Sequence, residues 1–125
     1  MSVDLRAAPG VGSLLVDISY DPAALELVRV QAAGLPSGTL FEYGVSQGRV
    51  TLGVVNASGL TGNWSIAYLT FKKAAGAATS GESTIAVSNV LAHRSDNLAQ
   101  VSATGSAGRV DLKNLSAVGP AVAFS

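Results

Sequence analysis

The stretch from residue 13 to residue 30 constrains the fold of this chain most, because it combines a strand, a tight corner and the start of a second strand. Apolar and aromatic residues alternate in it with other residues, the period of two expected of a strand that turns one face to a core. The residues on that face are Leu14, Val16, Ile18 and Tyr20. The pair Asp21-Pro22 ends the strand, because proline fixes φ and has no N–H to donate to a sheet. The pattern resumes at Leu25, so the segment predicts two strands that meet at a corner.

Short segments of the same kind recur along the rest of the chain, about 8 to 12 residues apart and separated by Gly or Pro. The expected strands are 3–7, 39–45, 49–56, 64–73, 84–90, 99–104 and 109–112. The first of them is expected to end at Pro9-Gly10. The only competing helical segment, 22–27, could make one turn. The pattern therefore predicts an all-β protein, an antiparallel β-sandwich of the jelly-roll type.

Length and composition narrow the function. With 125 residues, the chain has the size of a single domain with its own hydrophobic core. Its formal net charge is zero, so we expect no nucleic-acid partner and no attraction to an acidic membrane surface. The absence of cysteine excludes disulfides, thiolate metal sites and a cysteine nucleophile. No apolar run reaches the roughly 18 residues of a membrane span, so we expect no membrane insertion.

Four segments, taken in order, resemble the cohesin family, the β-sandwich receptor modules of bacterial scaffoldins. The run Tyr20-Asp21-Pro22 resembles the end of the family's third strand. Three further segments resemble later strands of the family: residues 48–52, 66–72 and 108–112. The resemblance spans residues 2 to 112 and implies a non-catalytic module that recognises a protein partner, by analogy a dockerin, in an extracellular or cell-surface scaffold. Residues 1–3 lack the features of a signal peptide, so we expect the export signal outside this sequence.

The chain departs from the family pattern at both ends. The family's usual first strand is missing, and residues 114–125 are additional. We expect a cohesin-like domain over 1–113, followed by a tail at 114–125 that is either a disordered linker or an extra edge strand. In the second case, residues 121–124 fill the open sheet edge either in their own molecule or in a neighbour. Filling the edge of a neighbour would give a homodimer by strand exchange.

The resemblance also implies where a partner binds. The family's polar pair in the third strand falls on Ser13 and Leu15, and Leu15 departs from it. Asn56 lies where an acid is common, and Gly59 lies where the family has a glycine. A loop near the other strand of this sheet contributes Arg94, Asp96, Asn97 and Leu98. Together these positions predict a small, mildly apolar and weakly charged binding face with a polar rim.

Two other functions remain open. Trp64 and Tyr43 would bind a sugar ring if they lay side by side on one exposed face, which would make the chain a carbohydrate-binding module. A structural domain of a surface layer or appendage, which engages its neighbours by strand addition, is the second alternative.

Catalysis and metal binding have little support in the sequence. His93 lies close to Ser95 and Asp96, but no nucleophile-elbow motif surrounds any serine, so a surface loop is expected there. The acids are scattered and lack the apolar setting that raises the pKa of a general acid. Asp96 and Asn97 offer oxygen ligands for a structural calcium ion, but two such ligands are too few for a site. We therefore expect no catalytic residue, no metal ligand and no cofactor.

Overall fold

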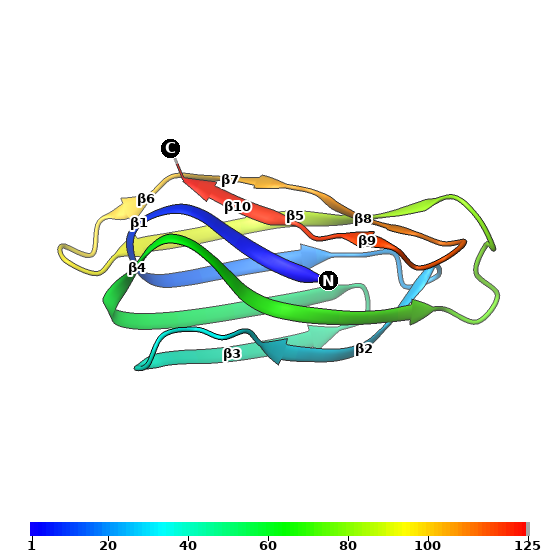
Figure 1. Cartoon of the computed structure of the whole chain (residues 1–125), viewed down its shortest axis with the longest axis horizontal. Coiled ribbons are helices and arrows are strands. Elements are labelled where there is room, and N and C mark those ends of the chain that lie inside the picture. Colours follow the sequence, from blue (N-terminus) through cyan, green and yellow to red (C-terminus); the bar gives the residue numbers. More distant parts are fainter. Residues whose placement is uncertain (125) are drawn as a thin grey trace.

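The computed structural model describes residues 1–124 and confirms an all-β, antiparallel sandwich, without a helix in that range (Figure 1). No segment of residues 1–124 is therefore a helix long and apolar enough to cross a membrane. The strands are β1 (Ser2–Ser19), β2 (Leu25–Ala32), β3 (Thr39–Ser46), β4 (Arg49–Lys73), β5 (Glu82–Arg94), β6 (Gln100–Val101), β7 (Ala103–Ser106), β8 (Gly108–Asp111), β9 (Ala117–Val118) and β10 (Ala121–Phe124).

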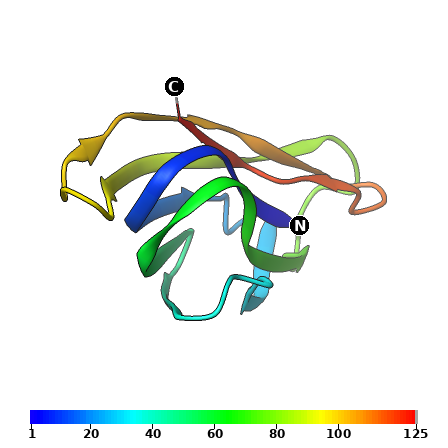
Figure 2. The same ribbon diagram turned by 60° about the vertical axis from the view of Figure 1, so that its left-hand side comes forward.

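Two long strands, β1 and β4, bend and contribute to both layers of the sandwich (Figures 1 and 2). What we call the front sheet contains β3, residues 49–56 of β4, residues 13–19 of β1, β5 and β6. The back sheet contains β2, residues 64–73 of β4, residues 2–6 of β1, β10 and β7. The β8–β9 hairpin pairs with the first residues of β5.

The bend in β1 corrects one expectation about the strands. The Pro9-Gly10 pair was expected to end the first strand, but it lies within a continuous strand that changes register several times between Leu5 and Ser13. Ala7 and Gly10 have positive φ values of 56° and 88°, which bend the backbone without breaking it. The N–H of Ala7 donates to Oδ1 of Asn63 on β4, 2.9 Å away, and holds the two bent strands together. The sheet therefore bends at this point and the chain stays extended.

The core lies between the two sheets and contains the predicted side chains of β1. Leu14, Val16 and Ile18 are all buried, and they meet buried residues of β4, β5 and the back sheet in one cluster. Each fully buried aliphatic side chain contributes about 1.5–3 kcal/mol through removal from water. Tyr20 is partly buried against this cluster, and its ring meets the ring of Phe71 edge-on at 5.1 Å.

The C-terminal strand β10 lies inside the back sheet, between β1 and β7 (Figure 2). It runs parallel to β1, with Ala121 opposite Asp4, and antiparallel to β7. Val122 is fully buried in the core. The carbonyl of Pro120 accepts a hydrogen bond from the N–H of Asp4 at 3.1 Å, just before β10 begins. Within the structure β10 thus pairs with strands of its own chain and has a neighbour on each side.

Candidate partner-binding face

The outer surface of the front sheet, here called the front face, has an apolar centre. Leu15 on β1 lies opposite Leu91 on β5 and opposite Gly53 on β4. Both leucines point away from the core, with exposed fractions of 38% and 40%. Leu40 on β3 and Val55 on β4 form a second exposed cross-strand pair on this sheet. Because strand residues alternate between faces, the burial of Leu14 and Val54 leaves their neighbours Leu15 and Val55 exposed.

Polar side chains surround this centre and are held by cross-strand contacts. Oγ of Ser13 lies 3.4 Å from Nδ1 of His93. Nearer the other end of the front sheet, the hydroxyl of Thr51 donates to Oδ1 of Asp17 at 2.7 Å, and the hydroxyl of Ser19 donates to that of Ser88 at 3.1 Å. An apolar centre inside a polar rim is the arrangement found at protein–protein interfaces. The front face therefore has the composition of a protein-binding surface.

Two of the expected binding residues do not present a side chain on the front face. Asn56 is only 4% exposed; its Nδ2 donates to Oγ1 of Thr39 at 2.8 Å, and its Oδ1 accepts from the N–H of Ser58 at 2.9 Å. Gly59 has a φ of 84°, and a Cβ there would collide with Oγ of Ser95 and crowd the backbone of Gly10. Both residues therefore stabilise the bend in β4.

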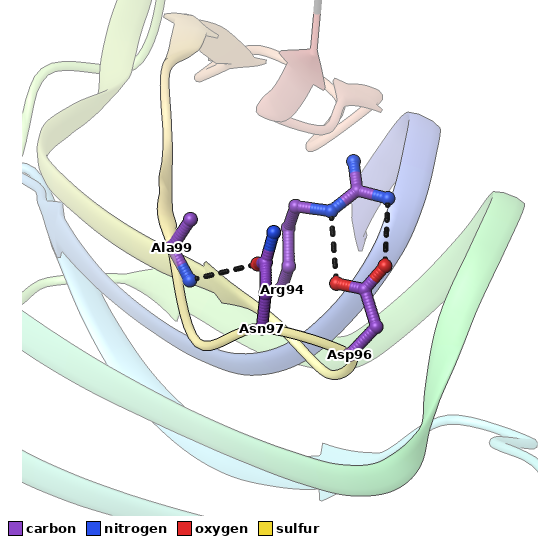
Figure 3. Close-up of polar contacts among 4 residues, drawn as sticks. All are labelled: Arg94, Asp96, Asn97 and Ala99. Atoms are coloured by element: carbon purple, nitrogen blue, oxygen red, sulfur yellow. Dashed lines mark hydrogen bonds and ion pairs between the residues drawn. The ribbon is translucent and has the colours of Figure 1, made fainter.

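The loop between β5 and β6 is a well-defined turn (Figure 3). Arg94 contacts Asp96 through two hydrogen bonds, Nε to Oδ1 at 3.1 Å and Nη2 to Oδ2 at 3.3 Å. The hydrogen bond from Arg94 lowers the pKa of the Asp96 carboxyl, and the same contact raises the pKa of Arg94. Oδ1 of Asn97 accepts from the N–H of Ala99 at 3.0 Å, while Leu98 has a positive φ of 59° and is 76% exposed.

This loop adjoins one end of the front face. Arg94 lies opposite Val11 on β1, and His93 lies opposite Ser13, so the loop follows directly from the polar pair that borders Leu15. The structure therefore places the loop at the end of the β1–β5 ladder, next to Ser13 and two positions further from Leu15. Sequence reasoning did not include Leu91, whose outward position follows from its alternation with the buried Ala92.

The two aromatic residues considered for sugar binding lie in separate surroundings. Trp64 lies on the back sheet, in a depression lined by Asp4 and Asn63 among others, and its indole N–H donates to the carbonyl of Thr61 at 3.1 Å. Tyr43 lies on β3, in a different depression that β2 also lines. The pair therefore does not form a shared stacking platform.

The structure also places the residues considered for catalysis and metal binding. His93 contacts Ser13 and not the neighbouring Ser95, and Asp96 is engaged by Arg94. Within residues 1–124, no three His, Cys, Asp or Glu side chains are grouped in a way that could hold a metal ion.

Comparisons with known proteins agree with this architecture. The chain has no match among curated proteins. Among solved structures it is similar to a non-cellulosomal cohesin from the archaeon Archaeoglobus fulgidus, with 18% identity, a TM-score of 0.63, and coverage of 100% of this chain and 83% of the other. It is also similar to the sixth cohesin of Acetivibrio cellulolyticus scaffoldin B, solved in complex with a Cel5 dockerin, with 17% identity, a TM-score of 0.67, and coverage of 92% and 77%.

A third similar structure is the OlpC cohesin of Clostridium thermocellum in a type I cohesin–dockerin complex. Its identity to this chain is 16% and the TM-score is 0.63, with 99% of this chain and 94% of the other covered. At these identities the structural likeness establishes the fold. The family model for the cohesin domain matches residues 1–112, nearly the whole sequence. The chain therefore belongs to the cohesin family.

Proposed function

We propose that the front face binds a protein partner of the dockerin type, as part of an extracellular or cell-surface scaffold. Cohesins are non-catalytic protein-binding modules, and two of the similar structures are complexes with dockerins. The observation that carries the proposal is the exposed apolar centre formed by Leu15, Leu91, Leu40 and Val55. The β5–β6 loop, with Arg94 and Leu98, provides a second contact at the end of the face.

The proposed site suits a partner with an apolar contact surface. Leu15 and Leu91 lie in paired positions on adjacent strands, so a single apolar side chain of the partner could contact both. The surrounding hydroxyl, imidazole and carboxylate groups offer hydrogen bonds at the margin. Because the sheet holds its backbone rigidly, binding requires little ordering of the chain. Specificity would then come mainly from the shape of the apolar centre, with a small contribution from charged groups.

Titration with purified calcium-loaded dockerin modules, followed by calorimetry, tests this proposal. Leu15→Glu and Leu91→Glu should each weaken binding by about tenfold or more, because a charge would be buried in the apolar centre. Tyr68→Glu is the matched control, since Tyr68 is similarly exposed but lies on the back sheet. Removal of calcium should abolish binding through the partner. Binding that tolerates both front-face substitutions would refute this site.

The same assay separates the alternatives predicted from the sequence. A carbohydrate-binding module would bind soluble polysaccharide, lose that binding on Trp64→Ala and keep it when calcium is removed. Strand exchange through β10 would instead give a dimer that disappears when residues 114–125 are deleted, if the shortened chain folds. Neither result is expected under the dockerin proposal.

A further inference from the structure

β3 forms a long and open edge of the front sheet. All eight residues of β3 pair with β4 in one uninterrupted register, and no other strand of residues 1–124 pairs with β3. The edge strand β2 of the back sheet differs, because a bulge at Val28 interrupts it and Glu26 and Arg29 place charges along it. Bulges and charges protect sheet edges against pairing with other chains. β3 lacks the bulge and has Glu42 as its only charged residue.

The side chains along this edge are apolar. Tyr43 and Val45 are 54% and 52% exposed, although they point to the same side of the sheet as the core residues Leu52 and Val50 opposite them. They remain exposed because the back sheet covers them only in part: both line an open depression together with residues 27–30 of β2. The edge thus combines unpaired backbone groups with exposed apolar side chains, which are the two features that favour strand addition.

We propose that a second copy of this chain covers the edge, with its β3 antiparallel to the first β3 and a twofold axis at Tyr43. In an edge strand every second residue directs its N–H and C=O outward. In a symmetric antiparallel pair, each residue of one β3 therefore lies opposite either the same residue of the second copy or a residue an even number of positions away. This requirement leaves few registers to compare.

Charge and length select among these registers. An axis at Glu42 would place two carboxylates opposite each other, which is unfavourable. An axis at Gly44 would pair only residues 42–46. An axis at Tyr43 pairs the longer segment 40–46, with Phe41 opposite Val45 of the second copy and Glu42 opposite the second copy's Gly44. At the centre of this register apolar residues meet apolar residues and the charged side chain faces a glycine, while Leu40 faces Ser46 at each end.

This inference goes beyond the proposed function, since the contact is made by the strand edge and not by the front face. The two front sheets would join into one continuous sheet, with both front faces on the same side. A partner array could then engage two adjacent sites, which raises avidity without any new contact between partner and site.

The test is sedimentation equilibrium of the full chain over a wide concentration range. The average mass should rise from that of one chain to that of two, and Tyr43→Lys or Val45→Lys should abolish the rise by placing a charge in the contact. Val28→Lys is the matched control, because Val28 is 56% exposed at the edge of the other sheet. Circular dichroism of each variant verifies that it folds. A wild type that stays monomeric, or a dimer that survives both edge substitutions, would overturn the proposal.

Mixing two variants tests the register. Tyr43→Lys and Tyr43→Glu should each be monomeric, because like charges meet at the axis. An equimolar mixture should dimerise again, because opposite charges then face each other. A mixture that stays monomeric while wild type dimerises would rule out the axis at Tyr43. Dockerin binding by the monomeric variants is measured separately, so failure here is distinct from failure of the front-face site.

Discussion

At the scale of single residues, Asn56 shows that a polar residue in a strand can serve the fold. Its amide group makes hydrogen bonds with the hydroxyl of Thr39 and the N–H of Ser58 at the point where β4 bends. Its side chain is almost fully buried. A buried amide is tolerated only when its hydrogen bonds are made. Leu15 is the opposite case, an apolar side chain on the outer face. The two residues contribute differently, Asn56 to the shape of the sheet and Leu15 to its surface.

Asn56→Ala should lower the free energy of unfolding by about 1–3 kcal/mol, because the N–H of Ser58 loses its acceptor and the hydroxyl oxygen of Thr39 loses a donor. Urea unfolding followed by tryptophan fluorescence, with Trp64 as the probe, measures this change. Glu42→Gln is the control, since Glu42 is exposed and should leave stability almost unchanged. A loss equal to that of the control would show that the amide does not hold the bend.

At the scale of elements, the back sheet depends on its last strand. β10 is the only strand of residues 1–124 that pairs with β7, and it also pairs with the first part of β1. Side chains on one side of β10 point into the core, among them Val122 and Phe124, while Ala123 is exposed. The strand therefore joins two segments that would otherwise both be open edges. Its contribution to stability should be large for its length.

Val122→Asp tests this role, because it places a carboxylate at a fully buried position. We expect a loss of more than about 3 kcal/mol, or failure to fold, since a buried unpaired charge is very costly. Ala123→Asp on the opposite side of the same strand is the matched control and should have little effect. Thermal unfolding by circular dichroism provides the comparison. Equal effects of both substitutions would mean that β10 is not held in the core.

At the scale of the whole molecule, packing dominates over charge. The formal net charge is zero, and the three ion pairs of the described residues are exposed. Exposed ion pairs contribute little to stability and are screened by salt. The stability of the fold must therefore come from the apolar cluster between the sheets and from the strand ladders.

The midpoint of thermal unfolding should accordingly stay within a few degrees between low and high sodium chloride concentration. Differential scanning calorimetry at neutral pH measures it directly. A variant with a new like-charge pair, Thr70→Lys beside Arg29, is the control, because its repulsion should be relieved by salt. A strong salt dependence in the wild type would show that electrostatics contributes more than the three ion pairs imply.

The sequence predicted the parts of this molecule that local alternation determines. The pattern of residues 13–20 identified Leu14, Val16 and Ile18 as core residues and left Leu15 outside, as the structure has it. Proline and glycine at positions 9 and 10 suggested that the strand ends there. Local propensity cannot show that pairing with β4 keeps the chain extended through the bend. The parallel pairing of β10 with β1 joins the two ends of the sequence, and no local pattern contains it.

The candidate site could be predicted from the sequence only in part. The family resemblance pointed to Ser13 and Leu15, but it could not show which side chains of this chain lie beside them. Leu91 and Val55 belong to strands far away in the sequence, and only the register between strands brings them next to β1. Asn56 reads as an outward polar residue, and its burial follows from the bend in β4.

The position of β10 also bears on how the protein is made. A ribosome releases β10 after every other strand of the sandwich, yet this strand sits beside β1, the first to emerge. Until then, two strand edges of the nascent chain lack their hydrogen-bond partners and the core is incomplete. Completion of the sandwich must therefore wait until β10 has been made, and a translating chain stays open to chaperones during that interval.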